Sequence, residues 1–554
     1  MNDSALSAPF PRAWPWLFAF AVVVGATIRL DQFTAQVLID DEWHAVHQLL
    51  RLSPAQMFLE FGHADYSIPL GMLDWLESRW FGLSETAMRW PMLACGLATL
   101  VVFPLYVAPR LGRATASVFA LLLAISPLLD VYSRIARPYA ITLLLGWVAH
   151  AQFQRFHAAT RGGLRAGAAY AIAAATAIWL HVIAAPFVAA PFLWAFADLR
   201  HAAPAARRAR FLRLAGLALV AGAMTAALML PPLLAHPQAL SVKAATDRPG
   251  LETLSGVWYA WLGTPSTAVV VLCVALAAVG ARAVWRAMPI ARTGALGIAL
   301  TFAGVMITSP AWSHVPLTLA RYLLPMLPLL LLGTAAGSVK VAGRIGAVGT
   351  GWPRAAAMLM AVLPLVALAV QSPLVPLLRH PNAQTVHFVH YLDFRADHNP
   401  YLPHIESIPM SPFWATLAAQ PAGTLRIAAA PFYFESYDWD APRWERASRQ
   451  TVIPGFLTGL CVDRRWGEVP QAPEFRFRNA VHLADTAALA EHGIDYVVWQ
   501  KPYVPLGRPG SMGGETAHCE AALRARFGTP AFEDPHLVAF RLPGVDRPLP
   551  RARR

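Results

Sequence analysis

Long apolar runs recur along the first two thirds of the sequence and constrain its fold more than any other feature. A helix needs about 20 mostly apolar residues to cross the hydrocarbon core of a bilayer. Runs near this length occur at residues 14–30, 87–108, 115–129, 138–154, 166–180, 182–198, 212–233, 266–284, 294–309, 317–337 and 355–373. Because 56% of the residues are hydrophobic and only 14% are charged, the sequence predicts a polytopic α-helical membrane protein, with about eleven transmembrane helices.

The basic residues indicate how these spans are oriented. The net charge is +13, but no nucleic-acid-binding motif accompanies it, so we expect no nucleic-acid partner. With a cytoplasmic N-terminus, the inside loops contain Arg110, Arg113, Arg155, Arg161, Arg165, Arg200, Arg207, Arg208, Arg210, Arg213, Arg282, Arg286, Arg292, Lys340, Arg344 and Arg354. The positive-inside rule favours this orientation. An odd number of spans then places the C-terminal region outside.

The first run is followed by a long polar segment. No small-residue cleavage site follows residues 14–30, so we expect a retained helix and not a removed signal peptide. Residues 31–86 then lie outside, and within them 43–61 and 68–81 have the pattern of two amphipathic helices on the bilayer surface. We therefore expect residues 1–378 to form a transmembrane module that this periplasmic loop interrupts.

The composition changes after about residue 379 towards proline, acidic and aromatic residues. Apolar stretches of strand length, at 425–430, 495–499 and 537–542, alternate with helical patterns at 486–492 and 517–527. This alternation predicts a C-terminal periplasmic α/β domain over residues 379–554.

The four cysteines fall into two groups. Cys95 and Cys273 lie inside predicted spans, where an inert buried thiol is the ordinary interpretation. Cys461 and Cys519 both fall in the predicted outer domain, which is an oxidising compartment if the orientation holds. The sequence leaves open whether these two cysteines form a disulfide or remain free thiols.

An acidic triplet, Asp40, Asp41 and Glu42, follows the end of the first apolar run by ten residues. Carboxylates at the mouth of a membrane bundle suggest chemistry on a lipid-borne substrate. A solvated loop, or a helix start whose acidic residues complement the helix dipole, is the structural alternative.

Five short motifs occur in an order that resembles a known family. They are Asp41-Glu42 after the first span, His63-Ala-Asp-Tyr-Ser-Ile-Pro69, Arg89-Trp-Pro91, Ser133-Arg-Ile-Ala-Arg-Pro-Tyr139 and Arg321-Tyr322-Leu-Leu-Pro325. They occur in order across about two thirds of the chain and together resemble the GT-C membrane glycosyltransferases. The similar branch contains the protein mannosyltransferases and the lipid A aminoarabinose transferases.

The resemblance implies an inverting transfer of sugar from a polyprenyl-phosphate donor to an acceptor hydroxyl, at the periplasmic face of a bacterial inner membrane. The hydroxyl needs a base, for which Asp41 is the first candidate, with Asp40 and Glu42 as further acidic candidates. The departing phosphate gains negative charge, which cations stabilise. The expected substrate-binding residues are His63, Arg89, Arg137, Tyr139, His181, Arg321 and Tyr322.

The chain also departs from the family's pattern. Arg134 and Ile135 stand where relatives often carry Gln and Glu, so the acidic contribution of that loop is absent. Ala-Asp follows His63 where relatives carry Pro-Pro. The acceptor, which is a glycan, a lipid or a protein, is therefore not specified.

A metal site and two other functions remain as alternatives. His44 and His47 lie one helical turn apart, as do Glu60 and His63, a spacing compatible with a divalent metal. Such pairs also arise by chance among 18 histidines, so metal and cofactor requirements stay open. A lipid-linked sugar transporter or flippase, or a non-catalytic glycolipid-assembly component, would share the helical pattern.

Overall fold

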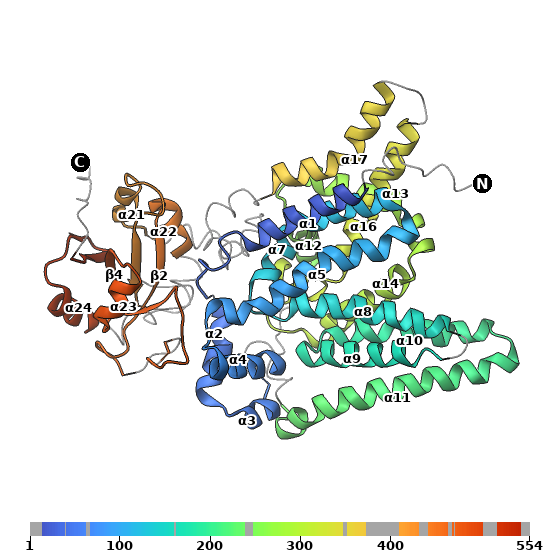
Figure 1. Ribbon diagram of the computed structural model, residues 1–554, viewed down its shortest axis with the longest axis horizontal. Coiled ribbons are helices and arrows are strands. Elements are labelled where there is room, and N and C mark those ends of the chain that lie inside the picture. The colour runs from blue at the N-terminus through green and yellow to red at the C-terminus, as the bar shows by residue number, and fades with distance from the viewer. Residues whose placement is uncertain are drawn as a thin grey trace.

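The computed structural model describes residues 14–38, 40–61, 67–159, 162–238, 248–346, 352–372, 409–431, 441–463, 468–469, 471–501 and 518–543. It shows an elongated bundle of helices with a smaller domain, containing a β-sheet, at one end (Figure 1). A mostly helical part with candidate membrane spans is thus followed by a small C-terminal region that contains a sheet, in agreement with the coarse fold class predicted from the sequence, while the domain bounds stay a prediction.

The bundle is built from helices of very different lengths. They are α1 (Trp14–Leu30), α5 (Glu85–Leu111), α6 (Arg113–Ala124), α7 (Pro127–Arg134), α8 (Tyr139–Ala158), α9 (Leu164–Leu180), α10 (Ala184–Asp198), α11 (Pro204–Ala235), α12 (Leu251–Leu262), α13 (Thr267–Ala287), α14 (Pro289–Thr308), α15 (Pro316–Tyr322), α16 (Met326–Gly346) and α17 (Trp352–Gln371). Within the described ranges, five helices are long and apolar enough to cross a membrane, or six if α6 and α7 form one broken span. The count of eleven stays a prediction.

Two of the predicted spans are interrupted, which corrects the sequence analysis. Residues 115–129 bend by 58° between α6 and α7, where Pro127 begins the second helix. Residues 317–337 divide at a turn that contains Pro325, between α15 and α16. Proline lacks the N–H that would continue a helix, and the residue before it disfavours helical geometry. These prolines therefore break otherwise continuous apolar runs.

The segment between α1 and α5 contains α2 (Asp40–Arg51), α3 (Pro54–Leu59) and α4 (Ile68–Trp80). A single helix over 43–61 was wrong, because α2 ends at Arg51 and a new helix begins at Pro54. Ser53 caps this new helix by accepting a hydrogen bond from the backbone N–H of Gln56 at 3.4 Å. The predicted helix over 68–81 agrees with α4 to within one residue.

The C-terminal region contains α21 (Pro412–Leu417), β1 (Arg426–Ala430), α22 (Ala441–Ser448), β2 (Thr451–Phe456), β3 (Val481–His482), α23 (Thr486–Glu491), β4 (Tyr496–Gln500), α24 (Cys519–Phe527), β5 (Phe532–Glu533) and β6 (Leu537–Arg541). The strands form one sheet in the order β3-β2-β1-β4-β6-β5. Strand β1 pairs in parallel with β2 and β4, whereas β6 pairs antiparallel with β4. The three predicted strands correspond to β1, β4 and β6.

Backbone and side-chain hydrogen bonds fasten this domain to the bundle. The backbone of Leu83 pairs with the segment that precedes β3, and it accepts a hydrogen bond from the N–H of Arg476 at 2.7 Å. The carboxylate of Glu85 accepts a hydrogen bond from the N–H of Asn479 at 2.8 Å. The side-chain amide of Asn479 in turn donates to the carbonyl of Thr34 at 2.8 Å. The domain therefore contacts both the start of α5 and the segment before α2.

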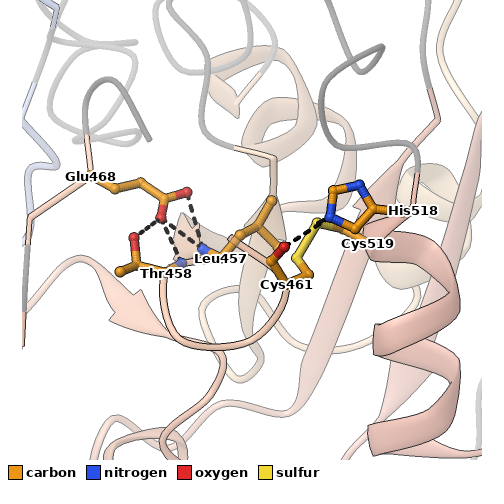
Figure 2. Close-up of a disulfide and its surroundings, with 6 residues drawn as sticks. All are labelled: Leu457, Thr458, Cys461, Glu468, His518 and Cys519. Carbon is orange, nitrogen blue, oxygen red and sulfur yellow. Dashed lines mark hydrogen bonds between the residues drawn. A yellow bond between two sulfur atoms is a disulfide. The ribbon is translucent and has the colours of Figure 1, made fainter. Parts of the chain in front are cut away.

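A disulfide joins Cys461 to Cys519, so the structure answers the question that the sequence left open. It links the loop after β2 to the start of α24 across 58 residues of sequence (Figure 2). Nearby, the carboxylate of Glu468 accepts hydrogen bonds from the backbone N–H groups of Leu457 and Thr458. Cys95 and Cys273 are free thiols.

Replacing Cys461 and Cys519 together with alanine should lower the unfolding free energy of the C-terminal domain by about 2–4 kcal/mol, because the cross-link restricts the unfolded chain. Limited proteolysis of the purified full-length protein across a temperature series would measure this loss. Cys95→Ala is the control, since that thiol is unbonded. Alkylation of both bridge cysteines in the folded, unreduced protein would contradict the prediction.

Candidate functional site

The carboxylate of Asp41, in the first turn of α2, faces two arginines that are distant in sequence. Its Oδ2 atom lies 3.5 Å from Nε of Arg137 and 3.5 Å from Nη1 of Arg321. Arg137 also donates to the backbone carbonyl of Asp41 at 3.4 Å. The side chain of Asp41 is 32% exposed, whereas that of Arg137 is 3% exposed. The Asp41 carboxylate is therefore partly accessible to solvent, whereas Arg137 is buried.

Helix breaks place both arginines. Arg137 lies in the short connection between α7 and α8, where Pro138 precedes the new helix. Arg321 lies in the last turn of α15, just before the turn that contains Pro325. A break leaves the guanidinium at a helix end, where it can point towards α2. The prolines that interrupt the apolar runs therefore also position the cations.

Aromatic rings surround the Arg321 guanidinium. Its central carbon lies 5.7 Å from the ring centre of Tyr139 and 5.6 Å from that of Tyr322, within the range of cation–π attraction. The ring of His181 lies 5.3 Å from Tyr139 and 6.0 Å from Tyr322, measured between centroids. The structure thus brings together five of the predicted substrate-binding residues with Asp41, namely Arg137, Tyr139, His181, Arg321 and Tyr322.

A cavity adjoins this group. Its polar lining includes Tyr139, His181, Arg321 and Tyr322. Its apolar lining comes from Leu143, Phe187, Ile298 and Leu324. The cavity therefore has a cationic, aromatic part beside an apolar part that reaches between α8, α10 and α14.

Glu42 and Arg89 lie next to this site but are engaged with each other. Arg89 donates from Nε to Oε1 of Glu42 at 2.7 Å and from Nη2 to Oε2 at 2.5 Å, and both side chains are 0% exposed. Oε1 of Glu42 also accepts from the backbone N–H of Ala136 at 2.7 Å. Arg89 donates further to the carbonyls of Gln36 and Val37. Both side chains are therefore buried in mutual contact, and neither lines the cavity beside Asp41.

Arg134 has a similar structural position. It donates to the carbonyls of Ile28 at 3.0 Å and Asp31 at 2.6 Å, and to the side-chain oxygen of Gln36 at 3.4 Å. The arginine that departs from the family's pattern therefore holds the segment between α1 and α2.

Trp43 connects the site to the C-terminal domain, which the sequence did not reveal. Its ring centroid lies 5.6 Å from that of Phe456 and 5.4 Å from that of Phe477, both in edge-to-face contact. Trp43 is 1% exposed. Since Trp43 follows Asp41 by two residues, the position of the carboxylate depends on the docked domain. The one feature of the sequence that could have indicated this contact is the aromatic residue directly after the acidic triplet.

The remaining candidates are placed less fully. His63 and the start of its motif lie outside the described residues, and Asp40 begins α2 with a side chain that is also outside them. The rings of His44 and His47 lie 6.3 Å apart. Across the described ranges, no group of three or more His, Cys, Asp or Glu side chains is arranged to hold a metal ion. That part of the chain lends the metal hypothesis no support.

Comparisons with known proteins find a likeness only among solved structures. No family model and no curated protein sequence matches the chain. ArnT from Cupriavidus metallidurans is similar in the apo state, with 14% identity, a TM-score of 0.44 and coverage of 95% of this chain and 97% of that one. The same protein bound to undecaprenyl phosphate has 13% identity and a TM-score of 0.43, covering 95% and 98%.

A second similar structure is the archaeal oligosaccharyltransferase AglB from Archaeoglobus fulgidus, in complex with an inhibitory peptide and a dolichol-phosphate. It has 10% identity and a TM-score of 0.42, covering 93% of this chain and 71% of that one. ArnT and AglB are both GT-C membrane glycosyltransferases, the class that the sequence motifs resemble. At these identities and TM-scores, the likeness does not by itself assign an activity.

Glu42→Ala should lower the unfolding free energy by about 3–5 kcal/mol, because it leaves the Arg89 guanidinium buried without its counter-charge. Glu42→Gln should cost less, since it keeps a hydrogen-bond acceptor. Thermal unfolding in detergent would measure both losses, with the exposed Glu252→Ala as the control. Wild-type stability of Glu42→Ala together with lost turnover would instead assign Glu42 to the chemistry.

Proposed function

We propose that this protein is an inverting glycosyltransferase of the inner membrane. It moves a sugar from a polyprenyl-phosphate donor to an acceptor hydroxyl at the periplasmic face. The observation that carries this proposal is the Asp41 carboxylate, accessible and held at 3.5 Å from both Arg137 and Arg321 beside an aromatic cavity. The arrangement supplies both a base for the acceptor and cations for the leaving group.

The two parts of the cavity suit the two parts of such a donor. Guanidinium groups match the geometry of phosphate oxygens and bind them with charge-assisted hydrogen bonds, so Arg137 and Arg321 would hold the donor phosphate. The apolar lining formed by Leu143, Phe187 and Ile298 matches the first isoprene units in chemistry, but the cavity has a volume of only about 30 Å³, so these side chains would have to move apart for the lipid to enter. A polyprenyl phosphate is the class of carrier bound in the ArnT complex, but the proposal rests on the chemistry of these residues.

Donor binding would also prepare the base. The incoming phosphate competes with Asp41 for Arg137 and Arg321, which releases the carboxylate towards the acceptor. Asp41 then accepts the proton of the acceptor hydroxyl as the oxygen bonds to the anomeric carbon from the face opposite the phosphate. The bond between the sugar and the phosphate breaks, and the phosphate leaves with the electron pair. The two arginines stabilise its growing charge.

The position of the site favours a transferase over a transporter. Its ionisable residues come from α2 and from helix ends near the C-terminal domain. Transporter sites usually lie near the bilayer midplane, between broken helices. A group at the end of the bundle, with an accessible carboxylate, suits a reaction with an acceptor that arrives from water or from another lipid.

Asp41→Asn should reduce turnover by about 100-fold or more while donor binding persists, because the amide keeps the shape but accepts no proton. A deletion strain complemented with each variant, followed by mass spectrometry of prenyl-phosphate sugars and envelope glycans, would measure this. The strain with Asp41→Asn should accumulate donor and lack product. Asp198→Asn, at the other end of the bundle, is the control. Product at wild-type level with Asp41→Asn would remove the residue from the mechanism and leave a different base or function.

Arg137→Ala and Arg321→Ala should each weaken binding of a polyprenyl-phosphate donor by about 10- to 100-fold, since each removes a charge-assisted contact. Lysine at either position should restore only part of the affinity, because it lacks the planar fork. Titration of the purified variants with a synthetic donor would measure the affinities. Arg344→Ala, an exposed arginine of α16, is the control. Equal affinity across wild type, alanine and lysine variants would refute the phosphate clamp.

A further inference from the structure

Helix α10 is joined to α11 at the end of the bundle opposite the C-terminal domain (Figure 1). Arginines line a hollow at this connection. A short 3-10 helix, η2 (Leu199–His201), forms this connection. The hollow lies between η2 and the first turns of α11 and has a volume of about 410 Å³. It is lined by Leu199, Arg200, Pro204, Arg207, Arg208 and Phe211. Three of its six lining residues are therefore cationic, and two are large and apolar.

The charge of these arginines is not balanced by the part of the protein that the structure describes. Arg200, Arg207 and Arg208 are exposed, and within the described ranges none of them forms an ion pair with a carboxylate. Asp198 is the only acidic residue between positions 190 and 213. Cations gathered around one hollow repel one another, so an anion from outside would stabilise the group.

Two arginines at this end of the bundle, Arg213 and the lining residue Arg207, donate hydrogen bonds to backbone carbonyls of the protein itself. Arg213 donates to the carbonyls of Phe156 and Ala159 at the end of α8, so its charge serves the fold. Arg207 donates to the carbonyls of Arg200 at 3.3 Å and Ala202 at 3.2 Å, which ties η2 to α11 and holds the hollow in shape. Arg208, by contrast, contacts no described polar partner and remains available to a ligand.

The length of α11 places the hollow at the level of lipid headgroups. Its 32 residues extend about 48 Å at 1.5 Å per residue, more than the roughly 30 Å of the hydrocarbon core. Strongly exposed apolar side chains on this helix begin at Phe211 and Leu212 and continue to Leu234. Arg207 and Arg208 lie one turn before this apolar surface. They therefore lie where the phosphates of a bilayer meet its acyl chains.

Two tryptophans mark the same level independently. Trp194 near the end of α10 and Trp285 near the end of α13 are 39% and 47% exposed. Their ring centroids lie 6.4 Å apart. Tryptophan is enriched at membrane–water interfaces, where its ring is buried and its N–H remains near water. The boundary between hydrocarbon and headgroups thus lies about one turn inward of the arginines.

We infer that this hollow binds the phosphate headgroup of an anionic glycerophospholipid from the adjacent leaflet. The forks of Arg200, Arg207 and Arg208 would donate to the phosphate oxygens. Leu199 and Phe211 would contact the start of the acyl chains. Such a lipid would fasten the α10–α11 connection, at a place that is far from Asp41 and independent of the sugar-transfer chemistry.

Lipid binding can be measured on the purified full-length protein in detergent, by native mass spectrometry and by thermal unfolding. Added phosphatidylglycerol should bind and raise the unfolding temperature, whereas phosphatidylcholine and inorganic phosphate should not. Arg207→Gln combined with Arg208→Gln should weaken the binding of phosphatidylglycerol by about 30-fold, from the usual contribution of two arginines near a membrane surface. Arg282→Gln combined with Arg286→Gln, two exposed arginines near the end of α13, is the matched control.

The possible outcomes distinguish a specific lipid-binding site from a general electrostatic attraction between the protein and anionic lipids. An equal loss in both double variants would mean diffuse attraction and would overturn the inference. Equal stabilisation by inorganic phosphate would indicate a free-anion site and would also overturn it. If the double variant Arg207→Gln with Arg208→Gln fails to fold, the affinity of Arg208→Gln alone for phosphatidylglycerol is the test, because the Arg208 side chain makes no described hydrogen bond. Unchanged affinity for phosphatidylglycerol in Arg208→Gln would then refute the assignment.

Discussion

The buried ion pair between Glu42 and Arg89 sets the geometry on which the site depends. Removing two charges from water is costly, and the attraction offsets that cost only when the contacts are close and the remaining polar atoms are satisfied. Here two short hydrogen bonds join the pair, and the backbone N–H of Ala136 donates a further hydrogen bond to the Glu42 carboxylate. Glu42 is adjacent to Asp41 and Ala136 is adjacent to Arg137. One structural pair therefore positions the carboxylate and one of its cations together.

The C-terminal domain extends the same framework, and among its described residues none is seen in contact with the Asp41 carboxylate. Asn479 donates to the carbonyls of Thr34 and Gln36, and Arg89 donates to that same carbonyl of Gln36. Trp43 packs against Phe477 of the domain. The segment before α2 is thus held from both sides, by the bundle and by the domain. A domain with no recognisable motif can therefore control how accurately the Asp41 carboxylate is placed.

The sequence predicted the members of the site better than their separate roles. Arg137 and Arg321 were identifiable because each lies at the end of an apolar run, beside a tyrosine and close to a proline. Arg89 also lies near the start of such a run, yet its guanidinium is buried and bonded to Glu42. Adjacent acids look alike in a sequence, but successive side chains on a helix point about 100° apart. Only the tertiary structure shows that Glu42 faces Arg89 while Asp41 faces the opening.

The fold also contains elements that the sequence pattern did not predict. Strands β1, β4 and β6 follow plain apolar stretches, whereas β2 contains Pro454 and Gly455, residues that disfavour strands, and it was missed. The interrupted spans were missed for a related reason. An apolar run predicts burial, but a proline within a run either bends a helix or ends it, and packing decides which. Length alone therefore overestimated the continuity of the predicted spans.

The distances in the two neighbouring ion pairs suggest why one pair is structural and the other is available for exchange. Arg89 holds Glu42 at 2.5 and 2.7 Å with no exposure to solvent, which is the range of strong charge-assisted hydrogen bonds. Arg137 and Arg321 lie 3.5 Å from an Asp41 side chain that is 32% exposed. An incoming phosphate with several oxygens can offer those two arginines shorter contacts than Asp41 does. A carboxylate and arginine are thus in close, fully buried contact at Glu42, whereas the contacts of the neighbouring Asp41 with its two arginines are longer and partly exposed.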